Sequence, residues 1–181
     1  MRMLGKSMSN NRSNDFISFA KTGKTEKLQK AICTGIDILT QDGKAFILSS
    51  RFGQVKSLDI LLNNLQSVQK QNVLRHCFLE GCSSNQREVV DYLLDNYFSD
   101  LNAEGMEEMA LKSCIIGNHT DMLLYLCAKY NFNINLNNDI VEWALRNDYQ
   151  DSYAKLEVVL LNKLLKEKTQ NLSHKKETIK I

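Results

Sequence analysis

Apolar and polar positions recur along this chain in four ungapped copies of one pattern. With spacings of 30, 32 and 32 residues, the copies superpose on the anchor residues Gly23, Gly53, Asn85 and Gly117. Apolar side chains stand seven and six positions before each anchor and five and nine positions after it, and a small residue stands three before it. Agreement at five positions in four copies without a gap indicates a true internal repeat.

The spacing on both sides of the anchor is helical, so each copy predicts two short antiparallel helices joined by a turn. Glycine adopts the left-handed conformation that ends a helix at little cost, and asparagine is the best substitute. A fifth, worn copy ends at an anchor at Asn147, and the sequence after it predicts a C-terminal capping helix. Because so short a pair cannot bury its apolar face alone, we expect the copies to stack.

The first copy carries a family likeness. Its run from Gly23 to Ile38, Gly-Lys-Thr-Glu-Lys-Leu-Gln-Lys-Ala-Ile-Cys-Thr-Gly-Ile-Asp-Ile, resembles the Gly-His-x-Glu-Val-Val-x-x-Leu-Leu-x-x-Gly-Ala-Asp-Val run of the ankyrin repeat family. Gln41-Asp42-Gly43-Lys44 is similar to the turn that opens an ankyrin unit, although no copy has the family's Thr-Pro-Leu-His start. The resemblance implies an all-α, ankyrin-like solenoid of about five stacked antiparallel helix pairs. A generic helical-hairpin solenoid is the alternative.

The repeat sets the expected domain boundaries. The repeat domain covers residues 15–166, in units of about 15–40, 44–68, 72–101, 106–135 and 138–166. Residues 1–14 are expected to form a flexible N-terminal arm, and residues 167–181 a basic polar tail, because neither has the apolar content that ordering requires.

Composition adds little that points to chemistry. The net charge is only +2, and no apolar run is long enough for a membrane helix. Five cysteines without a CxxC pair predict reduced thiols and a cytoplasmic setting, and Cys82 and Cys114 occupy the small-residue position of the repeat. No phosphate-binding, dinucleotide-binding, nucleophile-elbow or zincin motif occurs. We therefore expect no catalytic residue, no metal site and no cofactor.

The family resemblance also implies where a partner would bind. In ankyrin-like stacks the two residues before the turn glycine face a concave groove, and here several of them are apolar and stand beside arginines, as is typical of binding sites. The expected partner-binding residues are Asp42, Lys44, Arg51, Phe52, Ile115, Ile116, Leu145 and Arg146. The alternative is that the apolar members of this set tilt into the core.

These features predict a non-enzymatic protein–protein interaction module that binds a partner protein through its groove. By analogy with ankyrin-like proteins of pathogens and viruses, an effector or inhibitor delivered into a host cell is one form of this function. The alternatives are a regulatory or accessory subunit of an enzyme and a nucleic-acid-binding helical repeat. The last helix, which includes Leu156 and Leu161, is apolar on most sides and predicts a covering partner, such as a second copy in a homodimer.

Overall fold

The computed structural model describes residues 3–101, 105–130, 132, 139–147, 149–152, 154, 155, 157, 158 and 161. Over these residues the backbone is helical or turns between helices, without a strand, so the predicted all-α class is confirmed. The helices of this part of the chain are α1 (Met3–Lys21), α2 (Thr25–Cys33), α3 (Thr40–Arg51), α4 (Val55–Asn63), α5 (Ser67–Ser83), α6 (Arg87–Leu101), α7 (Met106–Ile116), α8 (Thr120–Tyr130) and α9 (Asp139–Arg146).

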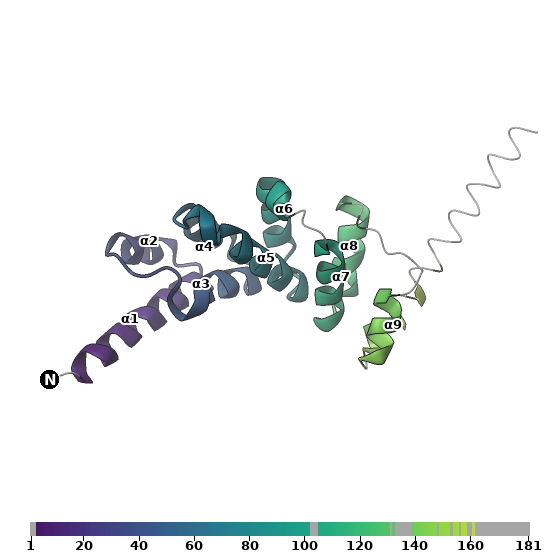
Figure 1. Cartoon of the computed structure of the whole chain (residues 1–181), viewed down its shortest axis with the longest axis horizontal. Helices are drawn as coiled ribbons and strands as arrows, with labels where there is room; N and C mark the ends of the chain where they lie inside the picture. The colour runs from purple at the N-terminus through teal and green to yellow at the C-terminus, as the bar shows by residue number, and fades with distance from the viewer. Residues whose placement is uncertain are drawn as a thin grey trace, which may run out of the picture.

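The helices form two rows, in which α2, α4 and α6 lie above α1, α3 and α5 in the view of Figure 1. In the first row α1 packs on α3, α3 on α5, α5 on α7 and α7 on α9, and in the second row α2 packs on α4 and α4 on α6. Each odd-numbered helix from α1 to α7 also packs on the even-numbered helix that follows it. A hydrogen bond from Tyr125 of α8 to Asp91 of α6 makes α8 the next helix of the second row. The chain therefore advances as a stack of helix pairs, in the order that the repeat predicts.

The same hydrogen-bonded turn closes each of the first three pairs. The left-handed residues of these turns are the predicted anchors Gly23, Gly53 and Asn85. In the second turn the Gly53 N–H donates to the Ser50 carbonyl at 3.2 Å, and the Gln54 N–H donates to the Ser49 carbonyl at 2.8 Å. This pair of bonds is the Schellman motif, which satisfies carbonyls that the end of a helix leaves without an intrahelical partner.

The fourth turn lies one residue later than the sequence analysis placed it. Gly117 is right-handed, with a φ of −74°, whereas Asn118 is left-handed, with a φ of 57°. The Asn118 N–H donates to the Ile115 carbonyl at 2.9 Å, and the His119 N–H donates to the Cys114 carbonyl at 2.8 Å. The anchor of the fourth unit is therefore Asn118, and the prediction of Gly117 was wrong.

A hydrogen-bonded turn also follows α9 in the fifth unit. The Tyr149 N–H donates to the Ala144 carbonyl at 3.0 Å, which is the second bond of the same motif. The bond places a turn near Asn147, as the repeat predicts.

Moving the fourth unit by one residue brings its buried side chains into line with the others. In the first three units, a buried phenylalanine (Phe16, Phe46 or Phe78) stands seven positions before the left-handed residue, with a small residue four positions after it. In the fourth unit these two places are taken by Leu111 and Ile115, both at most 2% exposed. A smaller residue at the first place and a larger one at the second keep the filled volume similar, which a packed core tolerates.

The first helix begins at Met3, inside the segment 1–14 that the sequence analysis assigned to a separate arm. No proline or glycine interrupts residues 6–21, so a helix held by the buried Phe16 can extend toward the N-terminus without a new nucleation step. Side-chain hydrogen bonds from Thr40 to Ser13 and from Gln41 to Asn14 tie this extension to the start of α3.

Predictions for the C-terminal part fall largely outside the described residues. Helical backbone recurs at residues 150–152, 154, 155, 157, 158 and 161. Leu156 and the tail 167–181 are not among the described residues, so the covering partner stays a prediction. None of the described helices has both the length and the apolar character needed to cross a membrane.

Candidate partner-binding groove

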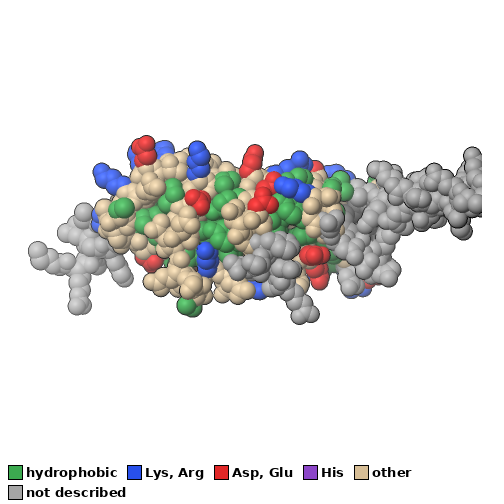
Figure 2. All heavy atoms as spheres, turned by 90° about the horizontal axis from the view of Figure 1, so that it is seen from above, with side chains coloured by type: hydrophobic (Ala, Val, Ile, Leu, Met, Phe, Trp, Pro, Cys, Tyr) green, Lys and Arg blue, Asp and Glu red, His purple; other side chains and the backbone are tan. Residues whose placement is uncertain are grey.

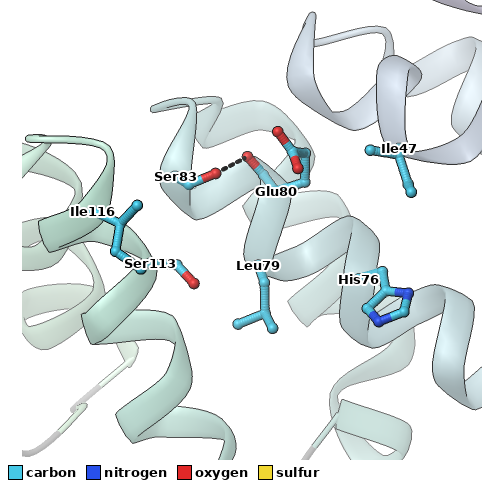
Figure 3. Close-up of a pocket in the computed structure, with 7 residues that line it drawn as sticks. All are labelled: Ile47, His76, Leu79, Glu80, Ser83, Ser113 and Ile116. Atoms are coloured by element: carbon cyan, nitrogen blue, oxygen red, sulfur yellow. Dashed lines mark hydrogen bonds between the residues drawn. The ribbon is translucent and has the colours of Figure 1, made fainter. Parts of the chain in front are cut away.

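Three successive helices of the first row line a hollow of about 360 Å³, which we call the groove. Its lining residues are Ile47 from α3, His76, Leu79, Glu80 and Ser83 from α5, and Ser113 and Ile116 from α7. Figure 3 shows Leu79 and Glu80 between the side chains of α7 on one side and Ile47 of α3 on the other. The volume lies at the lower end of the range of about 300–1,000 Å³ that ligand pockets occupy.

The repeat explains why these side chains meet. Each stands nine, six, five or two positions before the left-handed residue of its unit, on the face of the first helix that turns away from the second. Stacking the units therefore places equivalent positions side by side. The position six residues before the left-handed residue is apolar in α3 and α5, where it is occupied by Ile47 and Leu79, both half-buried.

The polar lining of the groove is fixed by the fold. The Arg51 Nε donates to the Glu80 carboxylate at 2.5 Å, linking α3 to α5, and the side chain of Arg51 stays half exposed. The Ser83 and Ser113 hydroxyls donate to carbonyls of their own helices at 3.1 and 2.8 Å. Since those protons are engaged, both hydroxyls offer the groove acceptor oxygens.

The structure separates the apolar residues of the predicted site into two classes. Phe52, Ile116 and Leu145 are exposed by 44%, 55% and 45%. Ile115 is 2% exposed, because the shifted register turns it into the small-residue position of the core. Ile115 is therefore a core residue, and the prediction that it binds a partner in the groove was wrong. Ile116 is the one of the two isoleucines that lines the groove.

Asp42 and Lys44 of the predicted site stand at the start of α3, and Arg146 is the last residue of α9. Asp42 belongs to three consecutive left-handed residues, 41–43, that precede the helical part of α3, and Lys44 is the exposed residue after them. Arg146 on α9 is paired with Glu142 at 2.8 Å, one helical turn away. The structure thus brings Arg51 and Ile116 to the groove and places the other predicted residues around or beyond it.

Three of the five cysteines, in the third and fourth units, are core residues. Cys77, Cys82 and Cys114 are buried, and no disulfide joins any of the five cysteines, all of which lie in the described part of the chain. Burial raises the pKa of Cys77 to about 12, and burial beside Cys114 raises the pKa of Cys82 well above its ordinary value. Such thiols are poor nucleophiles, because the thiolate is the reactive form. Among the described residues no group of three or more His, Cys, Asp or Glu side chains is placed to hold a metal ion.

The second row carries a tyrosine–aspartate ladder that the sequence analysis missed. Tyr92 donates its hydroxyl to Asp59 of the preceding unit at 2.7 Å, and Tyr125 donates to Asp91 of the preceding unit at 2.6 Å. Lys129 also pairs with Asp91 at 2.9 Å. Figure 2 looks onto this side of the molecule, where apolar patches lie between acidic and basic side chains.

The sequence analysis missed the ladder because it aligned the fourth unit on Gly117 and not on Asn118. Both aspartates stand six positions after the left-handed residue, and both tyrosines seven after it, once the fourth unit is anchored on Asn118. With Gly117 as the anchor, the two tyrosines fall in different columns. The correct register would have revealed the pairing in the sequence.

Comparison of the chain with models of known protein families and with curated proteins found no match.

Proposed function

We propose that this protein is an ankyrin-type helical-repeat module, without catalysis of its own, that binds a partner protein through the groove. The observation that carries the proposal is the groove itself, to which three successive units contribute aliphatic side chains. Ile47 and Leu79 stand at the same position of the second and third units, and Ile116 of the fourth unit stands four residues further along its helix. A hollow built by repetition extends along the stack, so it suits a segment of a partner that runs across several units.

The exposed apolar residues beside the groove supply candidate anchors. Ile116 lines the groove at one end, and Phe52, next to Arg51, lies toward the other. Interfaces concentrate their binding energy in a few apolar or aromatic residues and arginines that a partner covers completely. Burial of Ile116 and Phe52 is the main favourable contribution that we assign to the complex.

The partner is a protein rather than a nucleic acid because of what the groove contains. Its floor is aliphatic, and Glu80 places a carboxylate in its centre. Surfaces that follow a phosphate backbone depend instead on a dense row of cations. An enzyme whose activity this chain regulates is included among protein partners.

The proposal is tested with short random peptides displayed on phage and selected on the purified protein. Phe52→Asp and Ile116→Glu should each weaken binding of the selected peptides by about tenfold or more, since each leaves a charge to desolvate where burial was favourable. Leu124→Glu is the matched control, because Leu124 is a comparably exposed aliphatic residue on α8 in the second row.

Circular dichroism and thermal melting should be unchanged in all three variants, because none of the three side chains is buried. The proposal fails if the peptides bind the Ile116→Glu variant normally, or if Leu124→Glu has the larger effect. Unfolding of both groove variants would assign Phe52 and Ile116 to the core and would also contradict it.

A further inference from the structure

The groove-facing positions of the first row carry an excess of positive charge. In units one to four, the positions nine, six, five and two before the left-handed residue hold one carboxylate, Glu80, and the cations Lys21, Lys44, Arg51 and Lys112. Asp15 and Asp42 belong to the same end of the stack but stand outside these positions. The face that contains the groove is therefore cationic.

The unpaired positive charge is concentrated at one end of the groove. Lys112 on α7 is paired with Glu108 of its own helix at 2.5 Å, and Arg51 is paired with Glu80. Lys44 on α3 is exposed, and no ion pair is found for it among the described residues. The Lys21 Nζ on α1 lies 4.6 Å from the ring centre of Phe52, with no carboxylate among its described contacts. The uncompensated charge thus lies over α1 and α3.

This cationic end adjoins the aliphatic end. Lys44 occupies the position in α3 that His76 occupies in α5, and Arg51 the position that Ser83 occupies. Neighbouring packed helices are about 8–10 Å apart, so the cations stand about one helix spacing from the lining of the groove. An extended peptide covers that distance in about three residues.

We propose that the segment captured by the groove is an acidic linear peptide, whose aliphatic side chain fills the hollow at Leu79 and Ile116. Its carboxylates, a few residues away, lie over Lys21, Lys44 and the free edge of Arg51. Complementary charge raises the association rate and fixes which way the peptide runs along the stack. This inference rests on the proposed function and specifies the chemistry of the partner.

The test uses the same displayed random peptides, selected on the wild-type protein after removal of those that also bind the Ile116→Glu variant. The recovered peptides should be enriched in Asp and Glu within a few residues of Leu, Ile or Met. A synthetic peptide of the recovered sequence should bind Lys44→Glu about fivefold or more weakly at low ionic strength, and less so as salt is added. Because an anion is favoured at a helix N-terminus, this substitution should not destabilise α3.

Lys30→Glu is the matched control, since Lys30 is an exposed lysine on α2 and the substitution changes the net charge equally. It should leave the affinity within about twofold of wild type. Neutral or basic peptides that require Ile116 would overturn the acidic specificity and leave the groove function intact. Tighter binding of a uridine homopolymer than of any recovered peptide, lost in Lys44→Glu, would instead identify a nucleic-acid site. Recovery of no peptide that requires Ile116 would contradict both proposals.

Discussion

The Cα of Gly117 approaches the Ser83 carbonyl so closely that a Cβ on Gly117 would stand 2.1 Å from that oxygen. Gly117 directly follows α7, and Ser83 is the last residue of α5, which packs against α7 in the first row. Gly117 is therefore required by the approach of two backbones, and not by a left-handed conformation. Gly53, at the predicted turn, has the opposite requirement, with a φ of 68° and only the flexible Gln86 side chain nearby.

Gly117→Asn and Gly53→Asn should therefore differ sharply. Asparagine tolerates the left-handed conformation, as Asn85 and Asn118 show, so Gly53→Asn should cost about 1 kcal/mol or less of unfolding free energy. Gly117→Asn forces α5 and α7 apart and should cost about 3 kcal/mol or more. Urea unfolding followed by circular dichroism measures both. Equal costs would mean that the turn, and not the backbone contact, explains Gly117.

Asp91 should make stability depend on acid pH. Burial disfavours its charged form, but hydrogen bonds from Tyr125, Lys129 and Tyr130 outweigh this and lower its pKa below 3.8. The charged form is thus stabilised in the folded state, and that contribution is complete above the unfolded pKa of about 3.9 and lost as pH falls through the lower folded value.

Urea unfolding should show wild-type stability falling below about pH 4, and Asp91→Asn should flatten this fall and lower stability near neutral pH. Asp15→Asn, at an exposed carboxylate on α1, is the control and should keep the wild-type profile. An Asp91→Asn profile parallel to wild type would show that the carboxylate contributes nothing through its ionisation.

Thiol reactivity should follow burial. Cys33 is exposed and should react first with an aromatic disulfide reagent in the native protein. Cys77, Cys82 and Cys114 are buried, so they should react only as fast as the structure opens. Cys33→Ser should remove the fastest phase of the reaction. Rapid labelling of Cys82 or Cys114, located by mass spectrometry of the peptides, would contradict the packing described for α5 and α7.

The sequence was sufficient to predict the helix pairs, because apolar spacing and turn residues are local signals. Gly23, Gly53 and Asn85 lie at the turns where the repeat placed them. Gly117 misled the alignment because a glycine needed for a contact with Ser83, about one repeat away, looks the same in the sequence as one needed for a turn. Tertiary approach of two backbones has no local signature.

The candidate site was predictable only in part for the same reason. The resemblance to ankyrin units directed attention to the residues before each turn, and Ile116 and Phe52 are indeed exposed. Ile115 was misassigned because the register was one residue out. Leu79 and Ile47, the floor of the groove, stand in an apolar column that periodicity alone assigns to the core. Which members of such a column reach the surface depends on how the helices are spaced.

The central claim is that a partner covers the groove and not the second row. A photoreactive phenylalanine analogue placed at Ile116 or at Leu124, followed by irradiation in an extract of the native cell, compares the two surfaces directly, because both side chains are exposed and come from neighbouring helices. The account predicts a discrete crosslinked protein from position 116, lost when a groove-binding peptide is added in excess, and none from position 124. A crosslink from position 124 alone, or one from position 116 that the peptide does not displace, would contradict it.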